Sequence, residues 1–219
     1  FMHADLSFSR GRTNLHTITQ AATLHAYTGP IMADYAAYTC ASTIAELAED
    51  LTQNSAGTTE LYTLTHGAFA TLAHAQHTPQ RVLTRYLARA MDRSGWPLIG
   101  ERCTRCGTPL TPEATAREGT AEAPGRYLAF HTAHTYGQYT VLCPKCAPAT
   151  DAPLTALTAE DLAYALAAAS PNPRAWETID AAPRGTADKI LKLYLATTQN
   201  LLEHPLKTLG ALEAETPAK

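Results

Sequence analysis

Apolar and polar residues alternate over the first nine positions of the chain. The apolar residues fall on one face: Met2, Ala4, Leu6 and Phe8. A period of two predicts a β-strand. A turn around Gly11 and a second extended stretch from about Asn14 predict a hairpin. Because two strands alone are marginally stable in water, we expect residues 1–20 to be the last hairpin of a β domain whose other strands are absent from this sequence.

Beyond residue 20 the spacing of apolar residues changes to the period of a helix. This spacing predicts three helices, over residues 31–52, 58–75 and 79–94. The third should begin at Thr78-Pro79, with proline at its first position, and stop at Gly95. Two more helices are expected at 159–169 and 186–203, and a short last helix should reach Glu215. The sequence therefore predicts a helical bundle.

Several residues whose side chains could serve a functional site are better explained as packing residues. Cys40 lies on the apolar face of the first predicted helix and is expected to be a small core residue. Four tyrosines at helical core spacing are expected to pack in the same way: Tyr35, Tyr38, Tyr86 and Tyr194.

Residues 98–150 differ from the helical segments on either side. They contain four of the five cysteines, arranged as two CxxC units: Cys103, Cys106, Cys143 and Cys146. Proline and glycine recur between the two units, which predicts that the middle of this insert is a loop.

Two CxxC units can direct four sulfur atoms at one ion. Four thiolates in a tetrahedron fit Zn²⁺, which a closed site of this kind holds structurally rather than catalytically. Thirty-six residues separate the pairs, and each doubling of a loop adds only about 0.6 kcal/mol of closure entropy. The alternatives are two disulfides or four unrelated thiols. His131 and His134 have a spacing that permits metal binding, but we expect surface histidines, because four cysteines already fill a tetrahedron. A metalloenzyme is the least favoured hypothesis.

Arginine recurs at every fourth position of the third predicted helix: Arg81, Arg85, Arg89 and Arg93. At about 100° per residue these side chains form one stripe, which we expect to be exposed, while apolar residues occupy another face. Residues 78–106 carry a net charge of +4 and the rest of the chain −7. Such a stripe suits phosphates or an acidic peptide. The alternative is a solvated face whose arginine stems cover apolar surface or pair with acidic residues of other helices.

Composition limits the possible function classes. The chain has 219 residues and a formal net charge of −3, which excludes a uniformly basic nucleic-acid coat protein. It contains 41 alanines and 32 threonines, and the remaining apolar share of about 26% is still typical of a globular protein. No apolar run is long enough to span a membrane. Phosphate-binding glycine loops and the GxSxG and HExxH motifs are also absent from the sequence.

The order of these features resembles the RecO family of bacterial recombination mediators. The resemblance extends over residues 1–212. It rests on the hairpin with Gly11-Arg12, Leu15 and Thr19-Gln20-Ala21, the helical bundle, the run RAMDRSGWPL at 89–98, CxxCG with a later CxxC, and the ending LLEHPLKT at 201–208.

The resemblance implies a mainly α fold, a helical bundle with a four-cysteine zinc-binding insert, preceded by a β-hairpin remnant of an OB-fold. Residues 1–22 would be the C-terminal strands of an incomplete OB-fold, and residues 23–219 the helical domain with its insert at 98–150. A structural Zn²⁺ would be held by Cys103, Cys106, Cys143 and Cys146.

The same resemblance implies a non-enzymatic, cytoplasmic DNA-repair mediator with no membrane contact. RecO-like proteins bind single- and double-stranded DNA and anneal complementary strands. They work with RecR, and sometimes RecF, to load RecA onto DNA coated by single-strand-binding protein, whose acidic C-terminal tail they engage. We expect the arginine stripe, and Arg85 and Arg89 above all, to bind that tail or DNA phosphates. The alternative is a zinc-stabilised helical adaptor without direct DNA binding.

Overall fold

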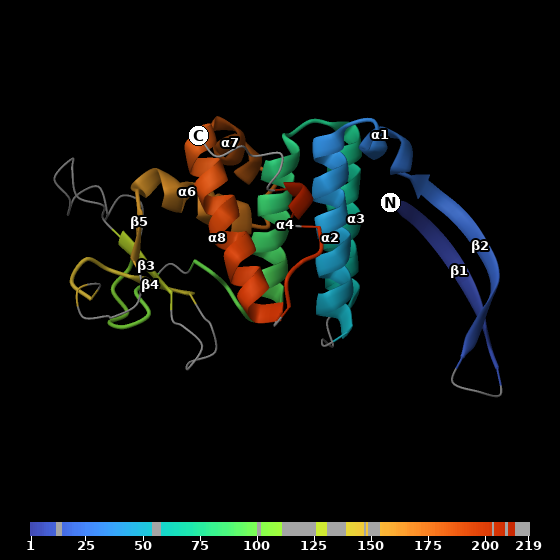
Figure 1. Cartoon of the computed structure of the whole chain (residues 1–219), viewed down its shortest axis with the longest axis horizontal. Helices are drawn as coiled ribbons and strands as arrows, with labels where there is room; N and C mark the ends of the chain where they lie inside the picture. The colour runs from blue at the N-terminus through green and yellow to red at the C-terminus, as the bar shows by residue number, and fades with distance from the viewer. Residues whose placement is uncertain are drawn as a thin grey trace.

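The fold is organised around one central helix, α4 (Pro79–Arg93), which the computed structural model places between two groups of helices (Figure 1). On one side lie α2 (Tyr35–Gln53) and α3 (Thr58–His74), and on the other α6 (Ala159–Ala169) and α8 (Arg184–Leu202). The described residues are 1–11, 15–53, 58–99, 102–110, 126–130, 139–146, 148, 154–202, 204–208 and 210–212.

The boundaries of α4 follow the signals in the sequence. Thr78 is the residue before the helix, Pro79 is its first residue, and Gly95 just beyond its end has a φ of 83°, which glycine adopts without strain. The Thr78 side chain forms no capping hydrogen bond. None of the described helices is both long and apolar enough to cross a bilayer.

The prediction that Cys40 is a core residue is confirmed, because its side chain in α2 is fully buried together with Ile44 and Leu47. Tyr86 and Tyr194 are buried as expected, but the prediction was wrong for Tyr35 and Tyr38, which are 62% and 42% exposed. At about 100° per residue these two tyrosines lie on the side of α2 opposite Cys40. Their spacing therefore placed them on a common face, but it was not the core face.

The C-terminal helices begin with a clear local signal. Thr158 and Asp161 form a capping box at the start of α6, where each side chain accepts a hydrogen bond from the other residue's backbone N–H. Two more elements follow, α7 (Ala175–Ala181) and α8. The prediction for α8 is confirmed within two residues, whereas α7 was not predicted. Of the short last helix, the structure describes one turn at 210–212.

The many threonines are compatible with helices because their hydroxyls bond within the helix. Thr43, Thr84 and Thr198 are buried, and each donates a hydrogen bond to the carbonyl oxygen four residues earlier, at distances of 3.0, 2.8 and 2.8 Å. A buried threonine can therefore replace an apolar core residue without leaving its hydroxyl group unpaired.

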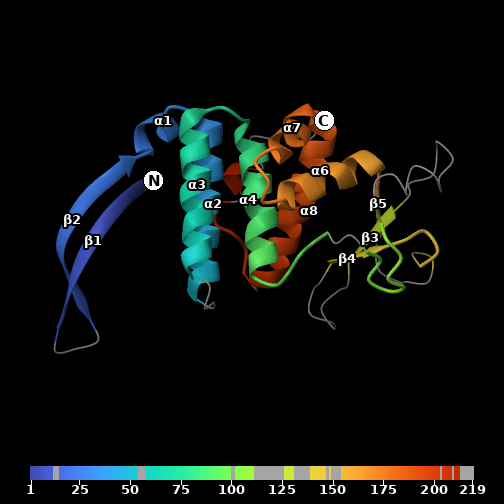
Figure 2. The same ribbon diagram turned by 180° about the vertical axis from the view of Figure 1, so that it is seen from behind.

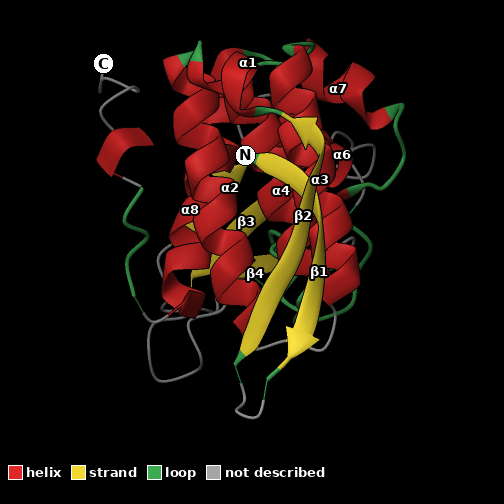
Figure 3. Cartoon of the chain, turned by 90° about the vertical axis from the view of Figure 1, so that its right-hand side faces the viewer, coloured by secondary structure: helices red, strands yellow, loops and turns green. Residues whose placement is uncertain are grey.

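The hairpin consists of β1 (Met2–Arg10) and β2 (His16–Ala26), paired antiparallel. It meets the bundle beside α2 and α3, and its far end curves away from the helices (Figures 1 and 3). The short helix α1 (Thr28–Met32) follows β2 and leads into α2. The second strand runs to Ala26, beyond the predicted end near residue 20, because its pairing with β1 continues to Met2. Most side chains of the hairpin are exposed, including Phe8 of β1 and Ile18 of β2.

A small antiparallel sheet lies at the other end of the bundle, with the order β4-β3-β5 (Figure 2). Its strands are β3 (Arg126–Phe130), β4 (Tyr139–Leu142) and β5 (Leu154–Leu157). The expected loop in the middle of the insert was therefore wrong for residues 126–130. This segment forms a strand because β4 and β5 supply hydrogen-bond partners on its two sides.

Candidate functional site

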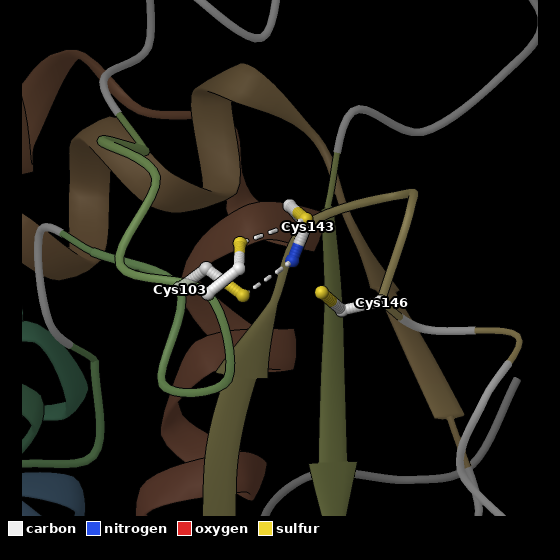
Figure 4. A group of neighbouring side chains, drawn as sticks. Cys103, Cys143 and Cys146 are labelled. Carbon is white, nitrogen blue, oxygen red and sulfur yellow. Dashed lines mark hydrogen bonds between the residues drawn. The ribbon is translucent and has the colours of Figure 1, made fainter.

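The structure brings the four cysteines of the insert together. The sulfur atoms of Cys103, Cys106, Cys143 and Cys146 all lie within 4.8 Å of one another. The Sγ atoms of Cys106 and Cys143 are 3.7 Å apart. With Zn–S bonds of about 2.3 Å, two ligands of a tetrahedron are separated by about 3.8 Å. Figure 4 shows Cys103, Cys143 and Cys146 pointing toward a common point. The donor set and its spacing fit Zn²⁺.

The first pair of cysteines lies in a tight turn that its sequence favours. The Gly107 N–H donates to the carbonyl oxygen of Cys103 at 2.8 Å, and Gly107 has a φ of 72°. Glycine adopts this conformation without strain, which explains its position directly after CxxC. The Arg102 side chain donates to the carbonyl oxygen of the same glycine at 3.0 Å, which further holds the turn.

The second pair follows directly after β4. The Thr104 N–H donates to the carbonyl oxygen of Val141 at 3.1 Å, so the first turn is bonded to the strand that carries the second pair. Leu110, Val141 and Leu142 are buried and belong to the same hydrophobic core as the bundle. A metal ion at this point would therefore connect two segments of the insert that are already packed on the helices.

The surroundings of the thiol groups favour the thiolate form at Cys106 but disfavour it at Cys146. Hydrogen bonds from the side chain and backbone of Thr108 and from Cys103 lower the pKa of Cys106 to about 6. Desolvation and then the neighbouring thiol groups raise the pKa of Cys146 to about 12. Four adjacent thiolates repel one another, and a divalent cation relieves that repulsion.

The arginine stripe is not exposed along its length, which corrects the expectation for Arg85. Its side chain is buried at 6% exposure. Its guanidinium donates to the carbonyl oxygens of Ala167 at 2.9 Å and Asn172 at 3.1 Å, and lies 5.1 Å from the ring centre of Trp176. Burial, and then the charge of Arg89, lowers the pKa of Arg85 to about 10. These contacts arise because α4 is a central helix, with α6 and α7 covering the face that carries Arg85.

Arg81 also contacts other parts of the fold. It is partly buried and donates to the carbonyl oxygens of Asp180 at 2.8 Å and Ala182 at 2.6 Å. Its guanidinium also lies 3.6 Å from the Asp180 carboxylate. The first two arginines of the stripe therefore fasten α7 and its neighbouring loops to α4.

The other two arginines face a groove. Arg93 is exposed and forms an ion pair with Glu60 of α3. Arg89 is partly buried and, among the residues that the structure describes, has no hydrogen-bond or ion-pair partner. Burial lowers its pKa, and the charge of Arg93 lowers it further. The groove has a volume of about 440 Å³.

The walls of this groove combine charge with apolar surface. Leu64 and Ala68 of α3 form one side, and Pro171, Pro173 and Trp176 form the other. The second side was not predicted from the sequence, because it belongs to helix α7 and the loop before it, which give no clear periodic signal. His131 and His134 lie outside the described residues.

A family model matches the part of the chain that forms the helical bundle and the cysteine insert. The family model described as "Recombination protein O C terminal" matches residues 32–210, which include the whole bundle and the cysteine insert. Members of this family are recombination mediators rather than known enzymes. The match covers more than half of the chain, and it begins at Met32, the last residue of α1. The chain therefore belongs to the RecO family and has a role in DNA recombination and repair.

Proposed function

We propose that this protein is a non-enzymatic recombination mediator that holds the acidic C-terminal tail of single-strand-binding protein in the groove between α3 and α7. Together with RecR it would anneal DNA strands and help to load RecA, with RecF as a further partner. The observation that carries the proposal is the guanidinium of Arg89, which has no polar partner among the described residues and is partly buried in a groove that also contains apolar surface.

The chemistry of the groove suits a peptide that is acidic and ends in apolar residues. Arg89 would form charge-assisted hydrogen bonds with carboxylates, and Arg93 at the rim would add a second cation. Trp176 and Leu64 would contact the apolar end. Arg85 would shape the wall of the groove through its bonds to Ala167 and Asn172 rather than bind the peptide directly.

A short peptide fits this groove better than a DNA duplex does. Proteins that bind duplex DNA tightly make roughly 6–10 phosphate contacts. Arg81 and Arg85 already bond to backbone carbonyls, so the groove offers two arginines to a ligand. We propose that single- and double-stranded DNA contacts the hairpin side, where β1 and β2 expose most of their side chains.

We also propose that the cysteine cluster binds a structural Zn²⁺ through Cys103, Cys106, Cys143 and Cys146. The ion would close the insert against the bundle and take no part in a reaction, since four sulfur ligands leave no open coordination position. Metal analysis of the purified chain should find about one zinc ion at this site, lost when Cys103 and Cys106 are both replaced by serine. A zinc content equal to that of the wild type in the double variant would contradict the assignment.

The groove can be tested with a fluorescent peptide that carries the acidic tail sequence. Charge reversal in Arg89→Glu/Arg93→Glu should weaken peptide binding by more than about tenfold, because the groove would then repel the carboxylates of the peptide instead of attracting them. Arg184→Glu is the matched control, since Arg184 is highly exposed and lies on α8 away from the groove. Equal peptide affinity in all three proteins would exclude the groove as the tail site.

An annealing assay separates the mediator from a helical adaptor without direct DNA binding. A mediator should accelerate annealing of complementary strands coated by single-strand-binding protein, and Arg89→Glu/Arg93→Glu should reduce that acceleration. An adaptor would bind the tail peptide with the same dependence on both arginines and leave the annealing rate unchanged.

A further inference from the structure

Three histidines that are far apart in the sequence converge where the hairpin meets the bundle. His3 belongs to β1, His25 to β2 and His66 to α3. One ring nitrogen from each lies within 4.8 Å of the other two. The group lies at the opposite end of the molecule from the small sheet and the cysteine insert (Figure 1). Neither the cysteine cluster nor the groove uses any of these side chains.

The fold brings these rings together through register and packing. His3 and His25 are directly paired across the hairpin, which places both side chains on one face. The register shifts directly after this pair. The His66 ring packs against His3 with ring centres 4.4 Å apart, and Tyr27 and Tyr62 also contact it. Two strands and a helix therefore each supply one imidazole.

The distances between the nitrogens are close to those of a metal site. The Nδ1 atoms of His3 and His25 are 3.2 Å apart. With Zn–N bonds of about 2.0–2.1 Å, two nitrogen ligands of a tetrahedron lie about 3.3 Å apart. A ring nitrogen of His66 lies within 4.8 Å of both others and supplies the third ligand.

The surroundings also orient His66. The Tyr27 hydroxyl lies 3.0 Å from Nε2 of His66, and Tyr27 itself is buried. A hydrogen bond to one ring nitrogen fixes the orientation of an imidazole that binds a metal through the other.

We propose that His3, His25 and His66 form a second transition-metal site that fastens the hairpin to α3. Three imidazoles suit a borderline divalent ion such as Zn²⁺, with water as the fourth ligand. Three neutral ligands leave the charge of the ion uncompensated, so this site should bind zinc more weakly than the four thiolates do. The ion would fix the position of the hairpin relative to the helices, whichever partner the groove binds.

The test counts zinc ions in the full chain after equilibration with dilute Zn²⁺. The wild type should hold about two ions, one at the cysteines and one at the histidines, and His25→Ala should hold about one. His25 is exposed, so its replacement should leave the fold intact. The matched controls are His16→Ala on β2 and His74→Ala on α3, which remove exposed histidines of the same elements and should each keep about two ions.

A second measurement distinguishes the two sites by their ligands. Co²⁺ at thiolates gives intense sulfur-to-cobalt charge-transfer absorption, whereas Co²⁺ at three imidazoles gives only weak visible bands. His25→Ala should lose a set of visible bands and retain the charge-transfer absorption. The proposal is overturned if His25→Ala takes up as many ions as the wild type with the same cobalt spectrum.

Discussion

Arg85 and Arg89 lie one turn apart on α4 but have different surroundings. Arg85 is buried, donates to two backbone carbonyls and lies over the ring of Trp176. Arg89 faces the groove and has no polar partner among the described residues. The comparison teaches that a row of like charges along a helix can divide into a structural half, here Arg81 and Arg85, and a groove-facing half, which we propose to be the binding half. Which half a residue belongs to depends on what packs over it.

The largest expected effect is on stability, from Arg85→Leu. This change leaves the carbonyl oxygens of Ala167 and Asn172 without their donor in a buried setting, and we expect a loss of about 3 kcal/mol. Urea denaturation monitored by circular dichroism measures the loss. Arg89→Leu is the matched control and should lower the free energy of unfolding by less than about 0.5 kcal/mol. Similar losses for both variants would abolish the distinction between them.

Arg81→Leu should have the next largest effect. Arg81 fastens Asp180 and Ala182 to α4 but is only partly buried, so we expect a loss of about 1–2 kcal/mol. The same denaturation experiment applies, with Arg184→Leu as a control expected to change stability by less than about 0.5 kcal/mol. A neutral Arg81→Leu would mean that α7 is held by its apolar contacts alone.

The contact between Arg85 and Trp176 gives a third test of the difference between Arg85 and Arg89, through the variant Trp176→Phe. Replacing the indole by a smaller ring weakens the contact with the Arg85 guanidinium, and we expect a loss of about 1 kcal/mol. A double-mutant cycle should give a coupling between positions 85 and 176 and little coupling between positions 89 and 176. Equal couplings would show that Arg89 also uses Trp176 for stability.

The smallest expected effect is a gain of affinity in Glu60→Gln. Removing this carboxylate releases Arg93 from its ion pair and removes a negative charge from the rim of the groove. Exposed ion pairs contribute about 0–1 kcal/mol, so the acidic peptide should bind about threefold more tightly. Fluorescence anisotropy with the labelled tail peptide measures the change. Weaker binding by Glu60→Gln would argue against an acidic ligand.

Much of the bundle could be predicted because its signals are local. Thr158 with Asp161, and Pro79 with Gly95, define the ends of α6 and α4 within a few residues of sequence. Helix α7 escaped prediction because seven residues give too few turns to establish a period. Strand β3 was not predicted because its pairing partners, β4 and β5, come from later in the chain.

The same difference between local and long-range signals decides which parts of the candidate sites could be predicted. The cysteine cluster could be predicted because each CxxC unit already forms a turn that places two sulfurs together. The hydrogen-bond partners of Arg85 could not be predicted, because Ala167 and Asn172 lie more than 80 residues away in the sequence and contribute only backbone oxygens. The three histidines also gave no signal, because register and packing alone bring His3, His25 and His66 together.

The most direct test of the central claim is the dissociation constant of the labelled acidic tail peptide for Arg89→Leu, measured beside the wild type at low and high salt. If Arg89 is the binding half of the row, the variant should bind about tenfold more weakly at low salt and show a smaller salt dependence. Wild-type affinity and wild-type salt dependence in Arg89→Leu would contradict the account.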